Sequence, residues 1–232
     1  MFGMSDAHHF RKMVAGFCMV FAPLFALIGF LMHPATHTNA SAQLGVVSAH
    51  MDGWYASHLF LFASVVLAVP AALGLMHMLR ERQAAMSHLG GGFALFGLMA
   101  IAGLIGIDMV TWQMGAGAHG EMASLLHRVT HTTGIVVPFV FGSLLFGVGY
   151  LALGMGIYRA RAAASWAAVC LMLGGIVFDV GVVATSIPLA IAAAAIVLIG
   201  QGSIGWMVWR ESDDAWEKTP EYAGFRALPG MR

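Results

Sequence analysis

The fold is decided by residues 162–209, AAASWAAVCLMLGGIVFDVGVVATSIPLAIAAAAIVLIGQGSIGWMVW, which contain one charged residue, Asp179. A membrane-spanning helix needs about 20 apolar residues, so this stretch is too long for a single crossing. Residues 185–188, Thr-Ser-Ile-Pro, have the composition of a turn. The stretch therefore predicts two membrane-spanning helices, at 162–184 and 189–209, joined by that turn.

Long uncharged intervals also run through the rest of the chain, which is 59% hydrophobic and only 9% charged, whereas a soluble domain carries roughly 25% charge. A charge in the middle of a bilayer costs about 2.5–3.5 kcal/mol, so the intervals between charges mark the spans. They predict four further helices, at 12–33, 54–79, 89–114 and 125–158. We expect an all-α, polytopic membrane protein with six transmembrane helices in one bundle (1–210) and a cytoplasmic tail (211–232).

Positive charge is concentrated on one side of this topology. Ten of the 11 lysine and arginine residues fall there, and Arg128 alone falls on the other side. The positive-inside rule therefore predicts that both termini are cytoplasmic, in a bacterial-type inner (plasma) membrane. Acidic residues also number 11, so the sequence offers no basic surface for nucleic acid, and membrane lipid is the expected partner.

Five ionisable residues within or beside the spans fall at one height. A rise of about 1.5 Å per residue from the cytoplasmic basic residues places them all roughly 27–42 Å away, near the outer edge of a hydrocarbon core of ~30 Å. They are His33, His58, Asp108, His131 and Asp179. Imidazole and carboxylate groups together are ligands for a transition metal such as Zn, Cu or Fe, or for a haem iron.

Two of the histidines have helical spacing. His127 and His131 are four residues apart, so on a helix they share one face and can share one metal ion. We predict a metal site made from this pair with His58, Asp108 and Asp179. A single histidine at the membrane interface is also typical of simple contact with lipid headgroups, and that interpretation is favoured for His33, His37, His50 and His119.

A haem b centre is the leading functional hypothesis. Two histidines on different helices can hold a haem between them, and His58 with His131 is the best pair because their predicted helices run in the same direction. Such a centre lies at one side of the membrane and must exchange electrons with a quinone or with another membrane subunit. The sequence therefore favours a role in redox chemistry or electron transfer.

Two other classes of function stay open. Three histidines and an aspartate are also the composition of a zinc-dependent hydrolase site acting on lipid. In this motif the chain is similar to the superfamily of alkaline ceramidases and adiponectin receptors, although here the His-x-x-x-His motif lies on the fourth of six predicted helices, not on a seventh. The third class is a non-catalytic membrane subunit or a proton-coupled carrier, in which Asp108 and Asp179 handle protons.

Overall fold

The computed structural model describes residues 4–117 and 119–217, and these residues form helices joined by short connections, without strands. Six helical segments are long and apolar enough to cross a membrane: Ala7–Met32, Met51–Leu79, Ala84–Gly115, Thr133–Ala160, Ser165–Val183 and Ile187–Arg210. The predicted all-α fold with six transmembrane helices is confirmed.

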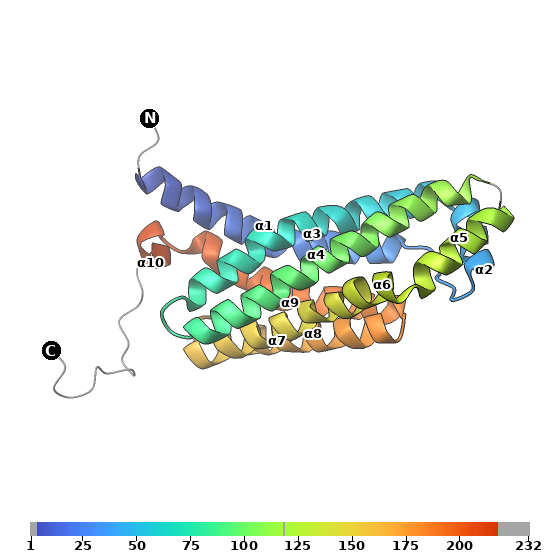
Figure 1. Cartoon of the computed structure of the whole chain (residues 1–232). Coiled ribbons are helices and arrows are strands. Elements are labelled where there is room, and N and C mark those ends of the chain that lie inside the picture. Colours follow the sequence, from blue (N-terminus) through green and yellow to red (C-terminus); the bar gives the residue numbers. More distant parts are fainter. Residues whose placement is uncertain (1–3, 118, 218–232) are drawn as a thin grey trace.

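The six spans pack as a closed ring in which each contacts the next and the last contacts the first. In ring order their main helices are α1 (Met4–Met32), α3 (Met51–Leu79), α4 (Ala84–Gly115), α7 (Gly142–Ala160), α8 (Ser165–Val183) and α9 (Ile187–Arg210). Figure 1 shows the elongated bundle that results. Large apolar side chains such as Phe96 and Met99, 66% and 70% exposed, point outward, where lipid would surround them.

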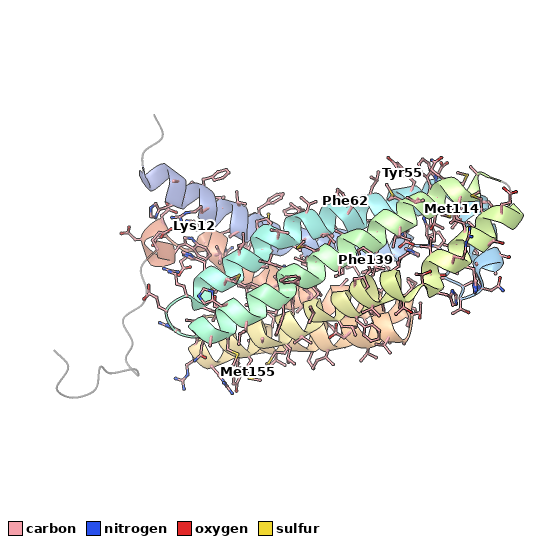
Figure 2. The ribbon with its side chains drawn as sticks, viewed as in Figure 1. Lys12, Tyr55, Phe62, Met114, Phe139 and Met155 are labelled. Carbon is pink, nitrogen blue, oxygen red and sulfur yellow. The ribbon has the colours of Figure 1, made fainter. Side chains whose placement is uncertain are left out.

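Shorter helices lie at the two ends of the bundle (Figure 1). We call one the α10 end, because α10 (Asp213–Glu217) lies there beside the first turns of α1. We call the other the α5 end, where α2 (Ala40–Ala49) packs against α5 (His119–His131). In Figure 2, Lys12 lies at the α10 end, and Tyr55 and Met114 lie toward the α5 end.

The interval expected to be one helix, 125–158, is divided in the structure. Helix α5 ends at His131, and Thr132 has an extended backbone, with φ −78° and ψ 119°, that interrupts the helical hydrogen bonds. The fourth span then begins as α6 (Thr133–Val136) and continues through a π-helical turn, η1 (Val137–Phe141), into α7. Pro138, which has no N–H to donate, lies in that turn. This correction removes His127 and His131 from the spanning helix.

Close contact between spans depends on glycine. A Cβ atom on Gly149 of α7 would overlap the backbone nitrogen of Ala94, and a Cβ on Gly97 of α4 would overlap the backbone of Phe146. Small residues of this kind let transmembrane helices approach closely. Helices α4 and α7 are therefore joined backbone to backbone, and this contact fixes one wall of the site described below.

The α10 end is closed by polar contacts between segments far apart in the sequence. Lys12, only 4% exposed, donates a hydrogen bond to the carbonyl oxygen of Glu211 at 2.7 Å. Arg80 donates to the carbonyl of Glu217 at 2.8 Å, and the ring of His77 stacks on Trp216 with a centroid distance of 4.5 Å. The first part of the predicted tail, residues 211–217, thus packs on the bundle, and residues 218–232 lie outside the described residues.

Candidate functional site

A histidine and an aspartate from neighbouring spans meet near the α5 end. His58 on α3 is 1% exposed, and its Nε2 atom lies 3.4 Å from Oδ2 of Asp108 on α4. The Asp108 side chain is 42% exposed. The pair therefore joins a fully buried imidazole to a carboxylate that the surroundings can reach.

The hydrogen bonds of His58 determine which ring nitrogen carries hydrogen. Nδ1 lies 2.7 Å from the backbone carbonyl oxygen of Trp54, which can only accept, so Nδ1 donates. In a neutral ring Nε2 then carries a lone pair, as does the carboxylate of Asp108. Nε2 is shielded from solvent and has no hydrogen-bond partner within the described residues. A proton between Nε2 and Asp108, or the hydroxyl group of a ligand, would supply the hydrogen bond that Nε2 lacks.

Trp54 connects the two members of the pair. Its carbonyl oxygen accepts from His58, and its indole N–H donates to the backbone carbonyl of Asp108 at 2.9 Å. Its ring lies 4.6 Å from the His58 ring and 4.9 Å from the His33 ring. One buried tryptophan thus fixes α3 against α4 at the level of the site.

His33, the first residue after α1, completes this aromatic group. Its ring centroid is 5.0 Å from that of His58, and its Nδ1 donates to the carbonyl oxygen of Pro34 at 2.7 Å. Burial lowers the pKa of His33, which keeps its ring neutral at neutral pH. The site therefore presents two imidazole rings and one carboxyl group, from three different segments.

An apolar cavity of about 300 Å³ extends from this group into the bundle. His33, Thr36, His58 and Asp108 line its polar end, and all six spans contribute to its walls. Its lining runs along α3 from His58 to Ala68, a distance of about 15 Å at helical rise. Because a volume of about 300 Å³ is spread over this length, the cavity is a narrow channel. Its size is at the lower end of small-molecule sites, which span roughly 300–1,000 Å³.

The other predicted site residues lie elsewhere. His127 and His131 are exposed on α5, with their rings 4.1 Å apart, and Asp179 lies on α8 against Gly147 of α7. Within residues 4–117 and 119–217, no three histidine, cysteine, aspartate or glutamate side chains are placed to hold one metal ion. Of the five residues predicted as metal ligands, the structure brings together His58 with Asp108 and His127 with His131, as two separate pairs.

The sequence did not predict two features of the site. His33 falls at the predicted height, but its sequence neighbourhood is that of an ordinary interfacial histidine. The cavity left no sequence signal, because its walls are made of the same small and apolar residues as every other helix contact.

The arrangement suits binding and proton transfer. His58 and Asp108 both line the cavity, so a polar head inside it would lie beside the pair, and Asp108 can exchange protons with the surroundings because it is partly exposed. Comparison with known proteins adds no assignment: no family model, curated protein or solved structure matches the chain.

Proposed function

We propose that this protein binds a quinone-like molecule inside the membrane and takes part in electron transfer. One observation carries the proposal: a buried imidazole nitrogen without a hydrogen-bond partner lies at the polar end of an apolar cavity. Since an unpaired buried polar atom costs about 1–3 kcal/mol, a ligand that supplies the missing partner is stabilised by that amount.

The shape of the cavity favours a slender tail. Its walls are apolar, with residues such as Leu61, Val65 and Leu98, and the channel is long compared with its volume. A lipid-soluble molecule with one chain fits such a space better than a lipid with two chains. Examples are a molecule with a single isoprenoid chain and a molecule built on a small fused ring.

The charges around the cavity favour an uncharged head. The described residues that line it include no lysine or arginine, so a phosphate or carboxylate head would be buried without a fixed positive charge. A carbonyl oxygen can accept a hydrogen bond from the protonated pair, and a hydroxyl group can donate one to His58 Nε2. A quinone offers the first group and a quinol the second.

The pair would supply protons but not electrons. Reduction of a quinone to a quinol adds two electrons and two protons, and His58 with Asp108 can deliver a proton to a head-group oxygen. The electrons come from a haem or metal centre, or from another membrane subunit. The histidines of the sequence predicted such a haem or metal centre. An absorbance spectrum of the purified protein tests whether a haem is bound.

Binding can be tested with a short-chain quinone added to the full-length protein in lipid nanodiscs. Quinone bound beside His58 should quench the fluorescence of Trp54, and Trp54→Phe identifies that part of the signal. His58→Gln and Asp108→Asn should each weaken binding about tenfold or more, equivalent to about 1.4 kcal/mol. His131→Gln is the matched control and should bind as the wild type does. Wild-type affinity in His58→Gln would refute the proposal.

A zinc-dependent hydrolase acting on lipid is the second candidate. The observation that favours it is the contact between the His127 and His131 rings on the exposed face of α5. If this candidate is right, the wild-type protein should be colourless and elemental analysis should find zinc in it. The same analysis should find no zinc in His131→Ala. A non-catalytic subunit or a proton-coupled carrier is the third class, and it predicts neither zinc nor a haem spectrum.

We also propose that the α10 end faces the cytoplasm of a bacterial-type plasma membrane. Lys12, Arg80 and Arg210 lie toward this end, as the positive-inside rule requires of the cytoplasmic side. A membrane-impermeant thiol reagent added to intact cells should label Gly120→Cys, at the α5 end. It should leave Ala84→Cys, at the α10 end, unlabelled until the cells are opened. The opposite pattern would reverse the orientation.

A further inference from the structure

A second polar group lies half-buried between two helices, apart from the cavity. Asp179 on α8 faces Gly147 on α7, and a Cβ atom at residue 147 would overlap the carboxyl group. Oδ1 of Asp179 is shielded from solvent and has no hydrogen-bond partner within the described residues. The contact between α7 and α8 is thus shaped around a carboxyl group that has a hydrogen bond from the backbone of Gly147 and an Oδ1 atom without a partner among the described residues.

The helices around Asp179 carry no positive charge near it. On α7 the ionisable residues are Tyr150, Tyr158 and Arg159, and Arg159 is twelve residues from Gly147, about 18 Å along the helix. Helix α8 adds only Cys170, and α9, which packs against α8, has only Arg210 at its last position. Without a counter-charge, this apolar interface favours the neutral acid over the ionised carboxylate.

The carboxyl group lies directly behind the cavity wall. Phe146 and Phe178, the residues preceding Gly147 and Asp179, both line the cavity, and their rings meet edge to face at 5.0 Å. Because the carboxyl group lies against Gly147, a movement that admits water to the shielded Oδ1 atom would part α7 from α8 at this residue. The same movement separates the two phenylalanine rings.

We propose that Asp179 is an intramembrane proton-binding site: the neutral acid holds α7 against α8, and loss of its proton opens the cavity wall between these helices toward the lipid. The opening would be a lateral entrance for the lipid-soluble ligand. The entrance rests on the proposed function of the cavity, whereas proton binding at Asp179 does not.

Infrared spectroscopy tests proton binding without any ligand. The full-length wild type in lipid vesicles should show the carbonyl band of a protonated carboxylic acid, and this band should be lost on raising the pH. At neutral pH, where ordinary carboxyl groups are ionised, Asp179→Asn should lack the band, while Asp52→Asn, which removes an exposed carboxyl group, should keep it. Persistence of the full band in Asp179→Asn would overturn the proposal.

A lipid-soluble carbodiimide gives a second readout on the unmodified chain. The acid adds across one C=N bond: the carboxyl oxygen bonds to the central carbon, the proton moves to nitrogen and nothing leaves. Peptide mapping should place the adduct on Asp179, more at low pH than at high pH. Labelling confined to Asp108 would contradict the assignment.

The entrance is tested by the rate at which quinone quenches Trp54. In the wild type this rate should rise with pH, as Asp179 loses its proton. In Asp179→Asn it should stay at the slow, low-pH value. If the wild type binds no quinone at all, the proposed function fails while the infrared result stands. If both proteins show the same pH-dependent rate, the entrance is wrong.

Discussion

The two ends of the bundle treat buried polar groups in opposite ways. At the α10 end, the buried Lys12 ammonium group has a carbonyl oxygen and the carboxylate of Asp213 as partners. At the α5 end, His58 is at least as deeply buried, but its Nε2 atom has no hydrogen-bond partner among the described residues. The α10 end therefore stabilises the fold, whereas the α5 end gives up some stability to keep a group available for a ligand or a proton.

The largest effect is expected for Trp216→Ala, at the α10 end. Trp216 is 5% exposed and stacks on His77, and its loss should lower the free energy of unfolding by about 3 kcal/mol, as for other buried aromatic residues. Equilibrium unfolding in mild detergent measures it. Trp206→Ala, which removes a 51% exposed ring from α9, is the control and should cost much less.

Lys12→Ala should have the next largest effect. It removes a charged donor to the Glu211 carbonyl group and the ion pair with Asp213, so we expect a loss of about 2 kcal/mol in the same measurement. Arg11→Ala breaks a more exposed ion pair with Glu217 and should cost less than about 1 kcal/mol. Equal effects in the two variants would show that burial of Lys12 is not what matters.

His58→Leu should change stability least among these substitutions, and in the opposite direction. It removes the unpaired Nε2 atom, while the Trp54 carbonyl keeps a hydrogen bond from Ser57 at 2.9 Å. We expect the free energy of unfolding to rise by up to about 1 kcal/mol, with quinone binding lost. A loss of stability comparable to that of Lys12→Ala would remove the contrast between the two ends.

The smallest effect is a change in pH dependence. A hydrogen bond from Lys12, helped by one from His9, lowers the pKa of Asp213 from its ordinary value of 3.8, so the fold favours the ionised carboxylate. This contribution is complete above pH 3.8 and is lost as the pH falls through the lower pKa of the folded state. The melting temperature of Asp213→Asn should thus fall less steeply than that of the wild type in this acid range. Identical slopes would rule out the contribution.

Much of the fold could be predicted because charge is excluded from a bilayer. The intervals between charges located all six spans, and the Thr-Ser-Ile-Pro turn separated α8 from α9 within a few residues. The break at Thr132 was missed, because α5 and the fourth span follow each other without a glycine or proline between them. When a single residue connects a helix outside the membrane to a helix that spans it, the two helices look like one continuous helix in the sequence.

The site could be predicted only in part. Depth counting placed His33, His58, Asp108, His131 and Asp179 at one height. It did not show that His33 lies beside His58, or that His131 lies away from it. The spans are apolar on every side, so their sequences do not show which face turns inward. Rotation about each helix axis is set by packing, such as the contact of Gly149 with Ala94, and this cannot be seen in a single sequence.

Trp54 also determines how the site can move. Trp54 is hydrogen-bonded both to the ring of His58 and to the backbone of Asp108. A shift of α3 along α4 would therefore have to break the indole hydrogen bond before it could separate the imidazole from the carboxylate. The two chemical groups consequently behave as one rigid part. Adjustment to ligands of different size must come from the opposite wall of the cavity, which α7, α8 and α9 form.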